Sequence, residues 1–151
     1  MPPGVIDLQF SEDRRDVVHR AVQALAEGFI VVFPTDVGYF AAVSALSAAA
    51  AERLAKSVGD CCDVVLGVKH GDEAADYLPP GYGHARRLMR RGWPGSLFID
   101  FPVDEEETAL GRLPGVVREM LVKQGRARVW LPCHKVIQDV LQLLVGPVVL
   151  V

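Results

Sequence analysis

The sequence predicts a single α/β domain in which a twisted, mixed sheet is flanked by helices. Short apolar runs that suit buried strands, such as Phe29–Phe33, Val64–Val68 and Ala127–Leu131, alternate with segments whose apolar residues recur at helical spacing. At 151 residues the chain is long enough for one domain with its own core, and no linker or repeat divides it. The strand–helix spacing is irregular and no glycine-rich phosphate-binding loop is present, which argues against a simple Rossmann or P-loop domain.

Composition and charge are those of a soluble globular protein. Apolar residues make up 50% of the chain and charged residues 23%, and no apolar run reaches the roughly 18 residues of a membrane span. The amino-terminal segment lacks the basic and apolar regions of a signal peptide, so we expect a cytoplasmic protein without membrane contact. The net charge of −3 gives no overall attraction to nucleic acid. Three cysteines, Cys61, Cys62 and Cys133, suit neither a disulfide framework nor a metal site, and no pattern indicates an oligomeric state.

The first helix is predicted over Asp13–Ala26, with Ser11 as its cap and acidic residues in its first turn. Its apolar residues recur at helical spacing, and Gly28 ends the run. The next segment, Phe29–Phe33, is apolar throughout. We therefore expect a strand inside the sheet that is buried on both faces, with Pro34 ending its hydrogen-bond ladder.

Polar residues emerge where this first strand ends, namely Thr35, Asp36 and Tyr39. Open α/β sheets place their ligand-binding groups at the ends of strands, so these residues are candidates for a site. The plainer interpretation is that Thr35 and Asp36 only cap a turn. Tyr39 would then be a core residue with its hydroxyl at the surface.

The remaining elements follow from the same two patterns. Helices are predicted over Ser44–Lys56 (with Ser44 or Ser47 as cap), Asp72–Tyr77, His84–Arg91, Pro114–Lys123 and Val136–Leu144, and strands over Val64–Val68, Ser96–Phe101, Ala127–Leu131 and Val148–Val151. The first and last helices should cover the sheet. Because an apolar strand at the very end of a chain would lack partners, we expect a truncated or unusually short domain.

Four blocks in order along the chain carry a resemblance to a known family. They are Pro34-Thr35-Asp36 with Tyr39, then Ala51–Lys56, then Trp93-Pro94-Gly95 with Leu97, and last Val129–Pro132, which Gly146-Pro147-Val148 follows. Together they resemble the YrdC-like domain, the threonylcarbamoyl-AMP synthase family. The resemblance covers nearly the whole chain and implies a YrdC-like domain over 1–151 without the family's C-terminal part.

The resemblance also implies a chemistry. The family joins L-threonine, bicarbonate and ATP into threonylcarbamoyl-AMP and pyrophosphate, for tRNA threonylcarbamoyladenosine formation. ATP and Mg enter as substrate and ion, and no tightly bound cofactor is implied. By resemblance, Thr35 and Tyr39 would help to bind the amino acid, and Lys56 would face carboxylate or phosphate oxygens. The plainer interpretation of Lys56 is a solvated lysine near a helix end.

The chain departs from the family pattern where cations are needed. The family has arginines where Val58 and Trp130 stand, and Leu150-Val151 falls where its serine- and asparagine-bearing loop begins. Each lost charged partner costs about 1.5–3 kcal/mol, so together these losses predict a degenerate domain of low activity. The alternative is compensation by other residues, for example Lys69, His70 or Arg128.

A second candidate surface is basic. Arg86, Arg87, Arg90 and Arg91 recur at helical spacing and would give one positive face. YrdC-like domains are associated with a positively charged surface and with binding of double-stranded RNA or tRNA. The resemblance therefore implies, as the alternative function, a non-catalytic RNA- or nucleotide-binding module. The plainer interpretation is a solvated helix face paired with the acidic residues at 104–107.

Overall fold

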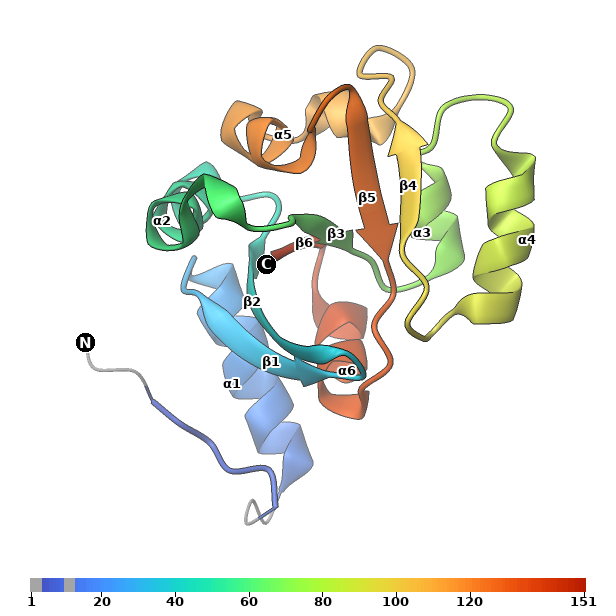
Figure 1. The fold of residues 1–151 in the computed structure, drawn as a ribbon. Helices are drawn as coiled ribbons and strands as arrows, with labels where there is room; N and C mark the ends of the chain where they lie inside the picture. The colour runs from blue at the N-terminus through green and yellow to red at the C-terminus, as the bar shows by residue number, and fades with distance from the viewer. Residues whose placement is uncertain (1–3, 10–12) are drawn as a thin grey trace.

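Figure 1 shows a strongly curved sheet with helices packed around it. The computed structural model describes residues 4–9 and 13–151. In these residues the helices are α1 (Arg14–Ala26), α2 (Ala48–Val58), α3 (Gly71–Ala75), α4 (Gly83–Gly92), α5 (Gly115–Leu121) and α6 (Lys135–Leu143), with 3-10 turns at Gly59–Cys61 and Ala109–Arg112. The strands are β1 (Val31–Thr35), β2 (Gly38–Ser44), β3 (Val65–Gly67), β4 (Ile99–Pro102), β5 (Arg126–Trp130) and β6 (Val148–Leu150). Each predicted helix is present within a few residues of its expected bounds.

The strands of the described residues form one six-stranded sheet in the order β1-β2-β6-β3-β5-β4. β3 and β5 run parallel, whereas the other neighbouring strands run antiparallel. The predicted fold class, one α/β domain with a mixed sheet flanked by helices, is confirmed. β6 comes last in sequence yet lies between β2 and β3, so both of its edges are paired.

The predicted position of the first strand is wrong. β1 lies at the edge of the sheet and covers Val31–Thr35 rather than Phe29–Phe33. Phe33 is buried, but Val32 is 61% exposed, so only one face of β1 is covered. Pro34 is part of the ladder and pairs with Tyr39. An edge strand tolerates proline because one side of its backbone needs no partner.

β2 is the element that the sequence analysis missed. Gly38–Ser44 pairs with β1 on one side and β6 on the other, and the small apolar residues Ala42 and Val43, which point to opposite faces of the sheet, are both fully buried. Alanines favour helix on intrinsic propensity. Here pairing on both sides decides the conformation instead, and the helix begins only at Ala48, where the Ser47 hydroxyl accepts the Ala50 N–H.

Helices α1 and α6 pack on each other and on the β1–β2 hairpin, as expected for the helices that cover the sheet (Figure 1). The Asp13 carboxylate caps α1 by accepting the Arg15 N–H, whereas the predicted cap, Ser11, lies outside the described residues. Among the described helices, none is both long enough and apolar enough to cross a membrane.

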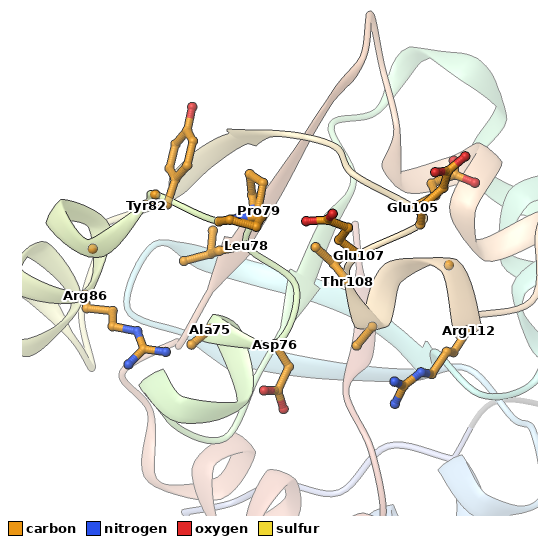
Figure 2. Close-up of a pocket in the computed structure, with 16 residues that line it drawn as sticks. Ala75, Asp76, Leu78, Pro79, Tyr82, Arg86, Glu105, Glu107, Thr108 and Arg112 are labelled. Atoms are coloured by element: carbon orange, nitrogen blue, oxygen red, sulfur yellow. The ribbon is translucent and has the colours of Figure 1, made fainter.

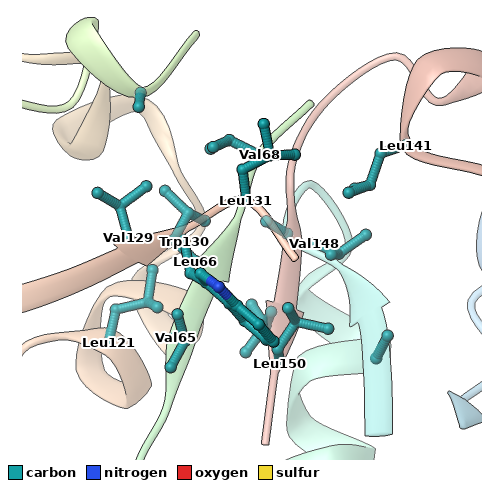
Figure 3. Close-up of a cluster of buried hydrophobic side chains, with 14 of the residues drawn as sticks. Val65, Leu66, Val68, Leu121, Val129, Trp130, Leu131, Leu141, Val148 and Leu150 are labelled. Carbon is teal, nitrogen blue, oxygen red and sulfur yellow. The ribbon is translucent and has the colours of Figure 1, made fainter. Parts of the chain in front are cut away.

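The core gathers where β3, β5 and β6 meet, and Figure 3 shows the side chains that fill it. Trp130 is the largest of the fully buried side chains. A Cβ on Gly67 would lie 2.7 Å from Leu150 and 2.8 Å from Val148, so these two side chains occupy the space above that glycine. The centre of the sheet is therefore packed solid on the face that carries Trp130.

Candidate functional site

The turn between β1 and β2 holds the first predicted site residue, Thr35. Its hydroxyl donates to the Gly38 carbonyl oxygen (2.7 Å) and accepts from the Val37 N–H (3.2 Å). Gly38 has a φ of 127°, a conformation that favours glycine. The Thr35 hydroxyl therefore closes a two-residue turn, and its proton is already donated within the protein.

Asp36 fastens this turn to two loops that are distant in sequence. One carboxylate oxygen accepts the Ser96 hydroxyl (3.0 Å), and the other accepts the Cys133 N–H (2.9 Å). The tip of the hairpin is thereby held beside the carboxyl end of β5. This is the edge where open sheets bind ligands, but here both carboxylate oxygens serve the protein's own structure.

Tyr39 lies on the opposite face of the hairpin from Thr35. Tyr39 pairs with Pro34, and successive strand residues alternate between faces, so the two side chains point to opposite sides. Tyr39 is 78% exposed. Lys56 is exposed in the last turn of α2. Within residues 4–9 and 13–151, no hydrogen bond or ion pair joins any two of these three predicted substrate-binding residues.

Trp130 occupies the position at which the family pattern has an arginine. The rings of Phe98 (4.6 Å between centroids) and Phe40 (5.2 Å) pack against it at tilted angles, and its indole N–H donates to the Gly95 carbonyl oxygen (2.5 Å). The side chain is entirely buried. Figure 3 shows it among the branched side chains of β3 and β6, Val65 and Leu150 among them. Trp130 is thus part of the core.

The cations proposed as substitutes for the missing arginines already have partners. Arg128 makes a bidentate contact with Asp100, at 2.6 and 3.1 Å, and lies 3.7 Å from Asp63. The hydrogen bonds from Arg128 hold the pKa of Asp100 below its ordinary value. Lys69 donates to the Leu144 carbonyl oxygen (3.3 Å) and lies 3.9 Å from Glu73.

The segment Trp93-Pro94-Gly95 has a structural role. Its Trp–Pro peptide bond is cis, and the Trp93 indole N–H donates to the Leu97 carbonyl oxygen (2.6 Å). A Cβ on Gly95 would lie 2.5 Å from the Gly92 carbonyl oxygen, so a larger residue cannot enter without a backbone shift. This tight loop supplies both the acceptor for Trp130 and the serine that donates to Asp36.

The arginine face predicted on α4 is present and solvated. Arg86, Arg87, Arg90 and Arg91 are all exposed, and none of them makes an ion pair with a described residue. The predicted pairing with acids at 104–107 is wrong. The Asp104 carboxylate instead accepts the backbone N–H groups of residues 106 and 107, and Glu105 pairs with Arg118 at 2.6 Å.

Two cavities flank α4. The larger, about 850 Å³, is an open hollow between the α3–α4 loop and the segment 105–112. Figure 2 shows Asp76 between Arg86 and Arg112, with Glu105 and Glu107 above them in the view. The smaller, about 370 Å³, lies between α3 and α4 and is bordered by residues of both helices and by Trp93 and Leu131. Thr35, Tyr39 and Lys56 line neither cavity.

The smaller cavity brings together groups that the sequence analysis treated separately. From the sequence, His70 is a possible substitute for the missing arginines, whereas Arg86 and Arg90 belong to a possible RNA-binding face. No spacing in the sequence links His70 to the two arginines, because the loop between α3 and α4 sets their separation. Among the described residues, no group of three or more His, Cys, Asp or Glu side chains is arranged to hold a metal ion.

The fold defined above is that of the Sua5 and YciO proteins. Sua5 from P. abyssi superposes with a TM-score of 0.79 at 22% identity, covering 97% of this chain and 40% of Sua5. Another P. abyssi Sua5 structure, complexed with L-threonine, gives a TM-score of 0.75 at 21% identity, covering 92% and 38%. E. coli YciO gives a TM-score of 0.72 at 22% identity, covering 93% of this chain and 65% of YciO. These likenesses confirm the YrdC-like fold that the four ordered sequence blocks predict.

One curated relative resembles the chain in sequence. It comes from Mycobacterium leprae (strain TN), carries the name "Putative threonylcarbamoyl-AMP synthase", and is 35% identical over 100 residues. The match covers 63% of this chain and 44% of the relative, so the chain matches less than half of that protein's length. No family model matches the chain.

Proposed function

We propose that this chain is a YrdC-like domain that has kept the fold of the threonylcarbamoyl-AMP synthases but does not itself make threonylcarbamoyl-AMP. The observation that carries the proposal is the fully buried position of Trp130, whose ring packs against Phe40 and Phe98. An arginine at that place would present a planar fork to a carboxylate or phosphate. The tryptophan presents an apolar ring instead, and its one donor is taken by Gly95.

Other features support the same conclusion. Val58, at the second arginine position, is a partly buried residue that packs against the core. The Thr35 hydroxyl closes a turn, and the ion pairs of Lys69 and Arg128 leave neither cation uncommitted. Transfer of the adenylyl group of ATP to an anionic acceptor, with pyrophosphate as the leaving group, depends on positioned cations. L-threonine, bicarbonate and ATP with Mg are therefore not turned over here.

The test is threonine-dependent pyrophosphate release by the purified chain in the presence of bicarbonate, ATP and Mg. A complete Sua5 enzyme assayed in parallel serves as the positive control. We expect release at the background rate measured without threonine. Turnover of about 1 per second or faster, a rate ordinary for enzymes, would refute the proposal and make Arg128 and Lys69 the first residues to replace.

A second candidate function is binding of double-stranded RNA through the arginine face of α4. The observation that favours it is that all four arginines are exposed without an acidic partner in the described residues. Guanidinium groups on one helix face can contact successive phosphates of a duplex. This function needs none of the lost catalytic groups.

The RNA test compares two double variants that lose the same charge. Arg87→Ala with Arg91→Ala removes half of the α4 face, and Arg15→Ala with Arg20→Ala removes two exposed arginines of α1. Anisotropy titrations of a labelled RNA duplex at several salt concentrations give the affinity and its salt slope. We expect each lost phosphate contact on α4 to lower the slope by about 1, with a smaller change for α1. Equal effects of the two double variants would contradict this function, because they would show that RNA binding depends only on the net charge of the protein.

A further inference from the structure

The smaller cavity beside α4 has the dimensions of a small-molecule site. Its volume, about 370 Å³, falls within the range of roughly 300–1,000 Å³ that is usual for ligand pockets. His70 and Asp72 border it from the α3 side, and Arg86 and Arg90 from α4. None of the three predicted threonine- and ATP-contacting residues reaches it.

The charges that face this cavity favour an anion. Arg86 and Arg90 are one helical turn apart, so their side chains emerge on the same side of α4. Neither makes an ion pair with a described residue, and Figure 2 shows Arg86 extending from α4 toward Ala75 of α3. Asp72 is the one acidic residue in the lining of this cavity, against two arginines, although Arg86 also borders the larger cavity with its acidic groups.

His70 adds a further donor. Its Nδ1 accepts the Glu73 N–H at 3.0 Å, so in the neutral ring the proton is on Nε2. That N–H is the ring's remaining polar group. A ligand oxygen between α3 and α4 could therefore accept from the imidazole as well as from the two arginines.

The rest of the lining is apolar. Met89 is 3% exposed and Leu131 is 9% exposed, and Trp93 completes the wall. Because the Trp93 indole N–H is occupied by the Leu97 carbonyl oxygen, the ring offers only its apolar surface. An inorganic anion would leave this wall uncovered, whereas an anion with an attached organic group would cover it.

We propose that this cavity binds a small phosphomonoester, with the phosphate dianion between Arg86 and Arg90 and the organic group against Met89, Trp93 and Leu131. A phosphate with three free oxygens can accept from both planar guanidinium groups and from His70. The proposal does not depend on RNA binding or on the lost synthase activity. The site differs from the Thr35–Lys56 region because it shares no residue with it.

The test is isothermal titration calorimetry of the whole chain with phenyl phosphate as probe. Inorganic phosphate and phenol supply the two halves of the probe separately. We expect phenyl phosphate to bind more tightly than inorganic phosphate and phenol to give no detectable heat. Binding of phenol as tight as that of phenyl phosphate would overturn the proposal, because the arginines would then contribute nothing.

Variants on one helix locate the site. Arg86→Ala and Arg90→Ala should each weaken phenyl phosphate binding by about tenfold or more. Arg87→Ala and Arg91→Ala, on the same helix but outside the cavity, should change it less than about twofold, as for a distant surface charge. Equal losses from all four would indicate general charge attraction and overturn the proposal. RNA binding can fail or succeed independently, because it is tested on Arg87 and Arg91.

Two more substitutions make the result specific. Asp72→Asn removes the opposing carboxylate and should tighten phenyl phosphate binding by a few-fold. Lys56→Ala should leave it unchanged, and a loss on that change would place the probe in the family's substrate region instead. All the substituted residues are exposed, so each variant should remain folded. Far-ultraviolet circular dichroism provides the check.

Discussion

Trp130 shows how a single residue can turn a polar position into part of the core. The ring packs against two tilted aromatic neighbours, Phe40 and Phe98, and its indole N–H donates to the Gly95 carbonyl oxygen. Aromatic pairs at such centroid distances each contribute about 0.5–1.5 kcal/mol beyond their buried area. The hairpin that carries Phe40 and the loop that carries Gly95 are both secured to β5 by this side chain.

We predict that Trp130→Ala lowers the free energy of unfolding by about 3–5 kcal/mol, the usual cost of truncating a large buried aromatic residue. The measurement is urea denaturation followed by circular dichroism. Tyr39→Ala is the matched control, because Tyr39 is 78% exposed, and it should change stability by no more than about 0.5 kcal/mol.

Restoring the family's arginine at this position should not restore a site. Trp130→Arg would place an unpaired guanidinium in a fully buried position, which costs several kcal/mol. We therefore expect that variant to be less stable than Trp130→Ala in the same urea titration. A folded Trp130→Arg protein that gains ATP affinity in calorimetry would contradict both this prediction and the core assignment of the tryptophan.

Glu73 provides a pH dependence. Burial raises the pKa of its carboxyl above the ordinary value, and the charges of Lys69 and His70 offset this only in part. Its Oε1 has no hydrogen-bond partner among the described residues. Because the folded-state pKa is the higher one, Glu73 contributes stability below its unfolded pKa of about 4.3, and this contribution is lost as the pH rises through the folded-state value.

We predict that Glu73→Gln flattens this part of the stability profile. Relative to the unchanged chain, the variant should gain stability as the pH rises from about 4 toward neutrality, across the window between the unfolded and folded pKa values. Unfolding free energies from urea titrations at a series of pH values provide the measurement. Parallel profiles for the two proteins would show that burial of Glu73 does not perturb its ionisation.

At the scale of elements, the β1–β2 hairpin is held at its tip as well as along its strands. Asp36 joins the tip to the loop after Trp93-Pro94-Gly95 and to the segment after β5. The curvature visible in Figure 1 brings the edge of the sheet near to these distant loops. The carboxylate thus closes the curved sheet across a large separation in sequence.

Replacement of Asp36 should loosen this closure. Asp36→Ala removes both acceptors, and because both hydrogen bonds are exposed, water can replace them, so we expect a loss of about 0.5–1.5 kcal/mol for each hydrogen bond. Asp36→Asn keeps one acceptor oxygen and should cost less. Hydrogen exchange at the Cys133 amide measures the local effect: its protection should fall in the alanine variant and fall less in the asparagine variant.

The sequence predicted the order of helices and strands along the chain better than it predicted which strands lie side by side in the sheet. Helical periodicity gave α1 to α6 within a few residues, because each helix satisfies its own backbone locally. β1 was predicted to be interior from its apolar residues alone. Its true position depends on β2, whose alanines do not favour a strand. One partner of β2, β1, directly precedes it, but the other, β6, lies at the far end of the sequence.

The candidate site was predictable only in part, for the same physical reason. The replacement of arginine by Trp130 can be read directly, but its burial depends on Phe40, which belongs to the missed strand. The four arginines of α4 were predictable from spacing, whereas the cavity that two of them share with His70 depends on how α3 packs against α4. Both the burial of Trp130 and the cavity between α3 and α4 depend on tertiary packing, which the sequence patterns do not determine.

At the scale of the whole molecule, the strand order makes the last strand indispensable. β6 is the only link between β2 and β3 within the described sheet, and its side chains fill the space above Gly67. Removal of residues 148–151 would leave two sheet halves with unpaired edges. We predict that the shortened chain loses its cooperative urea transition and its near-ultraviolet circular dichroism signal. A retained cooperative transition would mean that the two halves can pair without β6.

This strand order also determines when the sheet can form during translation. The β1–β2 hairpin and the β3–β5–β4 unit are synthesised before residues 148–150, yet the two cannot be joined through β6 until those residues emerge. During that interval the apolar residues of β2 and β3, Val43 and Leu66 among them, lie beside edges that have no partner. Such edges attract other nascent chains. The nascent domain should therefore depend on chaperones until its final strand has been translated.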